Sequence, residues 1–349
     1  MEKSDPRSNR HIVNLIKLTL EEPMKAILQT NYGSPDVLQL REVEKPTPKE
    51  DQVLVKVRAA SINALDYRFM RANPFFIRLM GRGVLKPKDM RFGRDVAGRV
   101  EAVGENVTQF RPGDEIFGTA NGAFAEYVLA KESYIALKPA NRSFEEAAAV
   151  PIAALTALQG LRDTAGIRSG QKVLIQGASG GVGTFAVQLA KSFGTEVTAV
   201  CSPRNLKLMR SLDADNIIDY TKEDFTKSGQ RYDLIFAVNG YHSLSSYKRA
   251  LCPQGRYVCA GGTLPQIFQA MLLGSRVSEK DGRKFSSMGV AKVDQKDLVY
   301  LAELLDAGKI TPVIDAHYPL SQTAEAVRYV EEKHAQGKVV ITVIHPDKA

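Results

Sequence analysis

The chain has 349 residues, of which 44% are hydrophobic and 25% charged, with 27 glycines and 16 prolines. These fractions are typical of globular proteins and exclude collagen-like and disordered chains. At roughly 150 residues per domain, the length predicts two domains, each large enough to bury a core. No run approaches the ~18 apolar residues that a membrane-spanning helix needs.

The charge distribution and the cysteine content restrict the expected partners and the expected cellular location. The formal net charge is +8, and most of the excess lies between Arg68 and Arg99, where nine Lys/Arg accompany two Asp. Such a stretch is typical of a solvated face, or of a surface that attracts an anionic substrate, RNA or a membrane. The three cysteines predict free thiols and a cytoplasmic location, because a long chain with an ample core needs no disulfide framework. Residues 1–23 lack the features of a signal peptide, so we expect an extension before the first domain.

The chain up to about residue 139 consists of short strand-like runs between turn signals, which predicts a small β-barrel or sandwich. Ser143, followed by Glu146 three residues later, predicts a helix start, and residues 147–161 predict one core helix. The strands expected in this part are 52–59, 95–103, 115–119 and 124–130.

From residue 171 onward, strands and helices alternate. This alternation is typical of a parallel sheet covered on both faces and predicts a doubly wound α/β domain. The expected strands are 171–176, 196–201, 216–220, 233–238 and 256–260, and the expected helices are 184–193 and 206–212. Two further helices, 297–307 and 323–334, and a strand, 338–344, close the chain.

The strongest local signal is the sequence Gly-Ala-Ser-Gly-Gly-Val-Gly at residues 177–183. It lies directly after a predicted strand and before a predicted helix, where a dinucleotide fold places its pyrophosphate on backbone N–H groups. Ala178 occupies the first glycine position of the G-x-G-x-x-G pattern. The residues expected to bind the cofactor here are Ser179, Gly180, Gly181, Val182 and Gly183.

The end of the next strand predicts NADP(H) rather than NAD(H). An NAD site places an acidic residue there, but this chain has Ser202, followed by Arg204 and Lys207. Removing an anion and adding a hydroxyl and two cations suits a 2′-phosphate. Tyr220, at the end of the third strand, either borders the adenosine or packs as an ordinary strand-end residue.

These motifs resemble the zinc-independent quinone oxidoreductase branch, the zeta-crystallin-like group, of the medium-chain dehydrogenase/reductase superfamily. The resemblance covers about residues 24–343. It implies a GroES-like catalytic barrel at 24–150, completed by 295–349, and a Rossmann domain at 151–294. It also implies a homodimer. The matching residues are Ser61–Tyr67 (SINALDY), Gly93–Val100 (GRDVAGRV), Arg111–Asp114 (RPGD), the glycine motif and Gly337–Val340 (GKVV).

A catalytic zinc ion is not expected. Related alcohol dehydrogenases take their ligands from Cys and His of the barrel, and residues 24–150 contain neither. Asn63 stands where those relatives carry a Cys ligand, and Arg94 where they carry a His. The four-cysteine structural zinc lobe is also missing.

Without a metal to stabilise an alkoxide, the expected acceptors are quinones and α,β-unsaturated carbonyls, which spread the incoming charge over a conjugated system. The resemblance favours Asn63 as hydrogen-bond donor to the acceptor carbonyl, although an Asn at a strand end also suits a turn or cap. Tyr67 is the candidate proton donor or a pocket wall. Thr156 either contacts the cofactor or packs in the core, and we expect Asp66 to be structural.

Two other functions remain open at this stage. An enoyl-thioester reductase would use the basic stretch to bind an acyl carrier, and a non-catalytic NADPH-binding protein would use it to contact RNA. No DNA partner is expected. The apolar runs 75–80 and 264–273 suit a substrate pocket, the core or a dimer surface.

Overall fold

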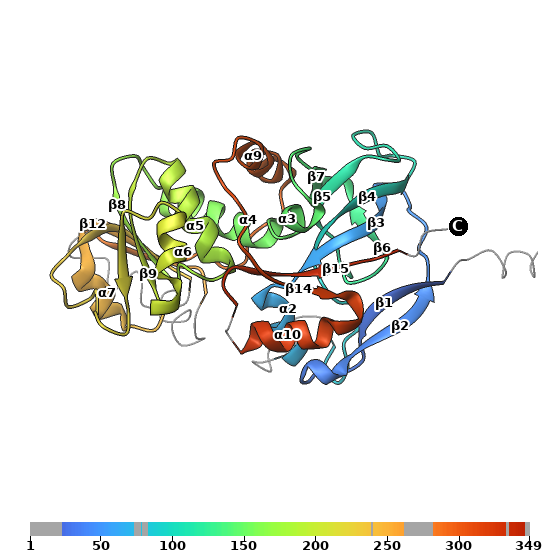
Figure 1. Ribbon diagram of the computed structural model, residues 1–349, viewed down its shortest axis with the longest axis horizontal. Helices are drawn as coiled ribbons and strands as arrows, with labels where there is room; N and C mark the ends of the chain where they lie inside the picture. Colours follow the sequence, from blue (N-terminus) through green and yellow to red (C-terminus); the bar gives the residue numbers. More distant parts are fainter. Residues whose placement is uncertain are drawn as a thin grey trace, which may run out of the picture.

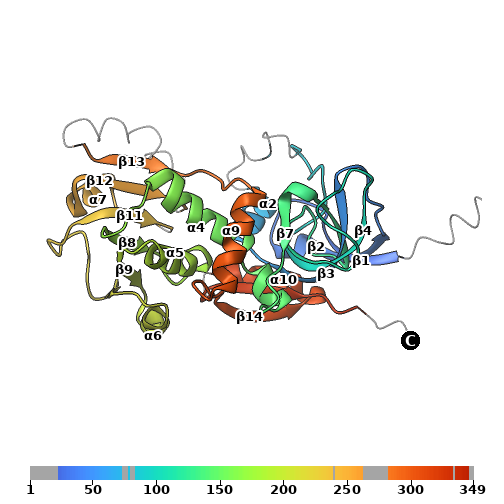
Figure 2. The ribbon, with the colours of Figure 1, turned by 90° about the horizontal axis from the view of Figure 1, so that it is seen from above.

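The computed structural model describes residues 23–72, 78, 83–238, 240–261, 282–332 and 335–345. Two lobes follow one another along the long axis, one built on a parallel sheet and the other on antiparallel strands (Figure 1). Helix α9 (Gln295–Asp306) lies between the lobes, beside α4 (Pro151–Gln159) (Figure 2). Among the described residues, no helix has the length and apolarity to cross a membrane.

The barrel lobe combines the two ends of the chain. Its seven-stranded sheet has the order β14-β15-β3-β4-β5-β7, with β6 also paired to β3. Strand β15, near the C-terminus, runs antiparallel to β3, which lies in the N-terminal part of the chain. The C-terminal segment therefore completes the barrel sheet. A separate hairpin joins β1 and β2. The bounds are β1 Pro23–Gln29, β2 Leu38–Glu44, β3 Gln52–Ser61, β4 Asp95–Val103, β5 Glu115–Thr119, β6 Tyr127–Lys131, β7 Ile135–Leu137, β14 Ile314–Pro319 and β15 Lys338–Thr342.

The predicted helix start at Ser143 is confirmed. Its hydroxyl accepts the N–H of Glu146 at 3.1 Å, and the Glu146 carboxylate accepts the N–H of Ser143 at 2.8 Å. The single core helix expected at 147–161 is wrong, because α3 (Phe144–Ala148) ends and α4 begins at Pro151. Proline is well suited to a first helical turn, where its missing N–H costs no bond. A π-helical turn, Gly160–Ala165, extends α4.

The other lobe contains a six-stranded, wholly parallel sheet in the order β10-β9-β8-β11-β12-β13. The chain order reverses between β8 and β11, and open α/β sheets bind ligands at such a switch point, beyond the carboxyl ends of the strands. The predicted doubly wound fold is therefore confirmed. The bounds are β8 Lys172–Gln176, β9 Glu196–Cys201, β10 Asn216–Asp219, β11 Tyr232–Ala237, β12 Leu251–Cys259 and β13 Lys284–Ser287.

Successive side chains of these strands point to opposite faces of the sheet, and both faces are buried. Val173 and Ile175 belong to the core cluster that includes α4 and α5 (Gly181–Ser192). Leu174 belongs to the cluster that includes Tyr247 of α7 (Leu244–Ala250). The remaining elements of the described residues are α2 Ala64–Arg71, α6 Leu206–Ser211, α10 Thr323–Glu331 and four 3₁₀ turns at Pro35–Val37, Glu132–Tyr134, Pro203–Asn205 and Leu320–Gln322.

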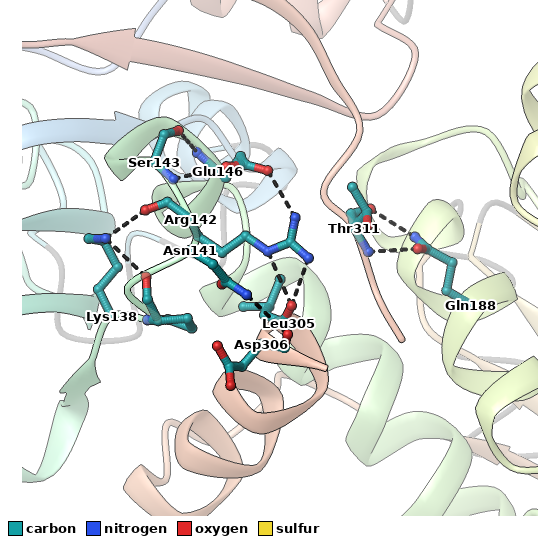
Figure 3. Close-up of polar contacts among 10 residues, drawn as sticks. Lys138, Asn141, Arg142, Ser143, Glu146, Gln188, Leu305, Asp306 and Thr311 are labelled. Atoms are coloured by element: carbon teal, nitrogen blue, oxygen red, sulfur yellow. Dashed lines mark hydrogen bonds and ion pairs between the residues drawn. The ribbon is translucent and has the colours of Figure 1, made fainter. Parts of the chain in front are cut away.

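Polar contacts fix the segment that returns from the parallel sheet to the barrel (Figure 3). Arg142 donates from Nε and Nη2 to the Leu305 carbonyl, and Asn141 donates to the Asp306 carbonyl at 3.0 Å. These carbonyls lie at the end of α9, where helical acceptors lack partners. The side-chain amide of Gln188 exchanges two hydrogen bonds with the backbone of Thr311. The boundaries at 150/151 and 294/295 remain predictions.

Candidate active site

The glycine loop begins where β8 ends and closes onto the first turn of α5. Gly177 has a φ of 77°, and a Cβ at Gly183 would overlap the Gly177 carbonyl oxygen, so both positions require glycine. Gly180 is different, because its φ is −82° and a Cβ there would meet nothing closer than 3.7 Å. The loop thus combines a tight inner turn with open space beside Gly180.

This geometry fits a dinucleotide phosphate. Gly180 is the N-cap of α5, and no side chain caps the helix. The N–H groups of the first turn, from Gly181 to Gly183, therefore have no intrahelical acceptor and suit an anion. Bound there, a nicotinamide dinucleotide would be held by backbone groups of the predicted residues, including Ser179 and Val182.

The residues predicted to select the 2′-phosphate lie beyond the ends of β9 and β10. Ser202 is the N-cap of the 3₁₀ turn Pro203–Asn205 and is half-buried, whereas Arg204 and Lys207 are exposed. Tyr220 directly follows β10, is 49% exposed, and donates its backbone N–H to the Cys201 carbonyl at 3.2 Å. The structure thus gathers these residues at the carboxyl edge of neighbouring parallel strands, together with the glycine loop.

Asn205 links the two parts of this site, and sequence reasoning missed it. Its Nδ2 donates to Ser179 Oγ at 2.7 Å and to Ser202 Oγ at 3.0 Å. The side chain is 3% exposed, and its Oδ1 is buried without a hydrogen-bond partner. The asparagine therefore fixes the glycine loop against the end of β9. An Asn three residues after a strand-end serine was the only available signal.

Asn63 lies at the barrel side of the site, as N-cap of α2. It is 7% exposed, and its backbone N–H donates to Asp66 Oδ2 at 2.7 Å. Its side-chain Nδ2 donates to Asp95 Oδ2 at 2.9 Å, and its Oδ1 accepts Lys338 Nζ at 2.6 Å. The capping role that we considered as the alternative is present, but the carboxamide is also held by two opposite charges.

Lys338 and Asp95 form a buried ion pair, 3.4 Å between Nζ and Oδ2. The Lys338 ammonium also donates to the Ile62 carbonyl at 2.9 Å. Asp95 accepts the Ser61 hydroxyl at 3.0 Å and the Ile152 N–H at 3.1 Å. Each charge is thus well coordinated, as burial requires. Burial lowers the pKa of Lys338, against the opposing effect of the two nearby aspartates.

The start of the strand that carries Lys338 contacts the glycine loop. The N–H of Gly337 donates to the Ser179 carbonyl at 2.8 Å, and a parallel bridge pairs Gly337 with Gly180. A Cβ on Gly181 would lie 2.9 Å from Lys338 Cδ. One strand start therefore contacts both the glycine loop and the Asn63 amide, joining the two lobes at the site.

Asp66 lines a cavity of about 240 Å³ in the barrel lobe, together with Phe69, Arg94 and the basic side chains Lys88 and Arg91. Burial is the largest influence on its carboxyl group and raises its pKa to about 7. Asp95 adds to the rise, while the Asn63 N–H, Lys338 and Arg94 oppose it. We expected Asp66 to be structural, and it does cap α2, but it also titrates near neutrality.

The other two predicted site residues lie on helices that meet this network. Tyr67 is on α2, half-buried, and packs against the barrel core. Thr156 is on α4, and its hydroxyl donates to the Ile152 carbonyl at 2.7 Å, one turn from the Ile152 N–H that Asp95 accepts. The apolar runs 75–80 and 264–273 lie outside the described residues, apart from Arg78, and so does the extension up to residue 22.

In the part of the chain that the structure describes, no three His, Cys, Asp or Glu side chains form a metal-binding group. Asn63 and Arg94 occupy the two barrel positions compared above with zinc ligands. A neutral amide and a cationic guanidinium are poor ligands for Zn²⁺, which prefers thiolate, imidazole and carboxylate. The donor set present here therefore does not fit a catalytic zinc ion.

Comparisons with known proteins agree with this architecture. Residues 49–140 match the family described as "Alcohol dehydrogenase GroES-like domain", and residues 212–341 match "Zinc-binding dehydrogenase". A 2-methylene-furan-3-one reductase from Solanum lycopersicum is 37% identical over 344 residues, covering 94% of this chain and 81% of that protein. The chain belongs to the quinone oxidoreductase branch of the medium-chain dehydrogenase/reductase superfamily.

Two further relatives support this family assignment. A chloroplastic NADPH-dependent alkenal/one oxidoreductase from Arabidopsis thaliana is 33% identical over 339 residues, covering 93% of this chain and 80% of that protein. The solved quinone oxidoreductase from Coxiella burnetii superposes with a TM-score of 0.80 at 30% identity, covering 93% of this chain and all of that one. The family and the two-domain fold inferred from the motifs are thereby confirmed.

Proposed function

We propose that this member of the quinone oxidoreductase branch reduces a quinone or an α,β-unsaturated carbonyl compound with NADPH and without zinc. The observation that carries the proposal is the Asn63 carboxamide. It is buried beside Lys338 and Asp95 and is joined to the glycine loop through Lys338 and Gly337. The similarity to reductases of alkenals, furanones and quinones supports the same acceptor class.

Reduction of a conjugated acceptor requires few catalytic groups from the barrel. Bound NADPH would supply a hydride, and the conjugated acceptor would spread the resulting negative charge toward its carbonyl oxygen. A hydrogen-bond donor on that oxygen and correct alignment are then the protein's main contributions. Asn63 is the proposed donor, and Tyr67 is the proposed proton source for the reduced acceptor.

The preference for NADPH over NADH rests on Ser202, Arg204 and Lys207. These residues supply a hydroxyl and two cations and replace the carboxylate with which NAD sites bind ribose. The Arabidopsis relative is named as NADPH-dependent, which agrees with this choice.

The test is NADPH oxidation at 340 nm with a quinone, a short enone, a crotonyl thioester and a simple ketone, each with and without a zinc chelator. We expect turnover of the quinone or enone, unaffected by chelation, and no turnover of the ketone. Asn63→Ala should lower kcat about 100- to 1,000-fold, as losing an oxyanion donor does. Asn141→Ala is the matched control, because Asn141 lies near the end of α9. The proposal would be contradicted by absent turnover of both the quinone and the enone, or by turnover that the chelator abolishes.

An enoyl thioester is the second candidate substrate, and the cavity beside Asp66 favours it. Lys88, Arg91 and Arg94 line this cavity, and cationic walls suit the phosphates of an acyl carrier. Asp89, however, forms a two-point ion pair with Arg91, which weakens the attraction. Turnover of the crotonyl thioester at least as efficient as that of the free enone would make this candidate the better one.

A homodimer and a cytoplasmic location belong to the proposal only as predictions. The dimer is a family expectation and the location follows from the free thiols, whereas the Arabidopsis relative is named as chloroplastic. Sedimentation of the purified protein tests the first prediction, and localisation of a tagged chain tests the second.

A further inference from the structure

Two charged groups determine the orientation of the Asn63 side chain. Lys338 has only N–H donors, so the amide must present Oδ1 to it, at 2.6 Å. Ionised Asp95 has only acceptors, so the amide must present Nδ2 to it, at 2.9 Å. A flipped amide would place donor against donor and acceptor against acceptor. The two buried charges therefore leave one possible orientation.

The remaining hydrogen-bonding capacity of this network is small. The Lys338 ammonium has three protons and three acceptors: Asn63 Oδ1, the Ile62 carbonyl and Asp95 Oδ2. Of the two Nδ2 protons of Asn63, one is donated to Asp95. The other has no hydrogen-bond partner among the described residues. This N–H is the donor that the network leaves for a ligand.

We propose that Lys338 is a positioning residue that fixes and polarises the Asn63 carboxamide, so that its second N–H serves as hydrogen-bond donor to the acceptor carbonyl. An ammonium bonded to the amide oxygen draws electron density from the amide nitrogen and strengthens the N–H as a donor, because hydrogen bonds in series polarise one another. The inference rests on the proposed reduction of quinones and enones.

The position of Lys338 at the start of β15 also connects it to the glycine loop. Gly337 and Lys338 contact the glycine loop through Ser179 and Gly181. The residue that orients Asn63 therefore belongs to the same strand start that contacts the glycine loop. Cofactor and carbonyl donor are thereby positioned by one strand end rather than by two independent lobes.

A double-mutant cycle tests the proposal. We expect Lys338→Met to lower kcat about 10- to 100-fold, because the amide loses its fixed orientation. The double variant Asn63→Ala/Lys338→Met should be no slower than Asn63→Ala alone, because Lys338 acts through that amide. NADPH affinity, measured by calorimetry without acceptor, should change less than threefold, since methionine retains the packing stem against Gly181.

Lys138→Met is the matched control. The Lys138 side chain is 4% exposed and donates to the carbonyls of Pro139 and Arg142 (Figure 3). It also forms an ion pair with Glu115 at 3.2 Å, so the substitution removes an equally buried ammonium outside the Asn63 network. Its kcat should stay within threefold of wild type. If Lys338→Met does not fold, Asp95→Asn/Lys338→Met, which removes both charges, takes its place in the cycle with Asn63→Ala.

A second readout needs no turnover. In nucleotide-free protein labelled with ¹⁵N-asparagine, the Asn63 side-chain signals are identified by their loss in Asn63→Ala. They should shift in Lys338→Met and not in Lys138→Met. Unchanged Asn63 signals, a kcat within threefold of wild type, or losses that multiply in the double variant would each overturn the positioning role. A wild-type enzyme that reduces no quinone or enone overturns the proposed function and this inference together, which distinguishes that failure from failure of the inference alone.

Discussion

The two halves of the site are built by different means. The nucleotide end uses backbone: glycine turns, a helix N-terminus and exposed cations beyond parallel strands. The barrel end uses a few buried side chains, with Lys338 at 3% and Asp95 at 0% exposure. Backbone sites depend on conformation, whereas buried charged networks depend on every partner being present. The two halves should therefore respond differently to substitution.

The largest expected effect contrasts two glycines of the loop. Gly183→Ala places a Cβ against the Gly177 carbonyl, so we expect a lower unfolding midpoint of the free protein and at least about 100-fold weaker NADPH binding. Gly180→Ala has room for its Cβ and should lower the midpoint much less than Gly183→Ala does, while weakening NADPH binding. Thermal unfolding and calorimetry measure both quantities. Equal midpoints for the two variants would show that the inner turn tolerates a side chain.

Arg204→Ala tests the cofactor selection at the exposed edge. Losing a charge-assisted phosphate contact of about 1.5–3 kcal/mol should reduce the preference for NADPH over NADH about 10- to 100-fold. Arg210→Ala, on the last turn of α6, is the control and should leave the preference unchanged. The measurement is kcat/KM with each cofactor. An unchanged ratio in Arg204→Ala would assign the phosphate contact elsewhere.

Tyr67→Phe tests the proton donor at the barrel end. We expect kcat to fall about tenfold or more with little change in KM, because a positioned general acid is lost while the ring remains. Tyr134→Phe, in the turn before β7, is the control. Steady-state kinetics with the enone decide the question. Full activity in Tyr67→Phe would leave the ring as a pocket wall.

The last prediction concerns the pH dependence of stability. The pKa of Asp66 is about 7 in the folded protein, against an ordinary value of 3.8, so the folded state retains a proton that the unfolded state has released. The resulting stabilisation is complete below pH ~4 and is lost as the pH rises through about 7. Asn cannot titrate, so the unfolding midpoint of Asp66→Asn relative to wild type should rise from pH 4 to 8.

Thermal unfolding across this pH range is the measurement. Asp306→Asn, on the exposed end of α9, is the control and should keep a constant difference from wild type. A constant difference for Asp66→Asn as well would place the Asp66 titration outside this range.

Most of the regular structure was predictable because it depends on local pattern. The strands Asp95–Val103, Glu115–Thr119 and Glu196–Cys201 have the predicted bounds. The errors occurred where tertiary contacts decide. Strands β1 and β2 were not predicted as a pair, and Pro151 divides the expected core helix. An apolar run does not by itself reveal where one helix stops and another starts.

The sequence alone determined the family, the glycine motif that predicts a nucleotide site, and the absence of Cys and His from residues 24–150. A glycine motif between strand and helix acts through neighbouring backbone atoms, so it can be recognised from the sequence alone. The tertiary structure decided the barrel end. Asn63, Asp95 and Lys338 are far apart in the chain and meet only when β15 pairs with β3 and β3 pairs with β4. Their shared role depends on which charges face which amide atoms, and strand pairing over that distance determines this.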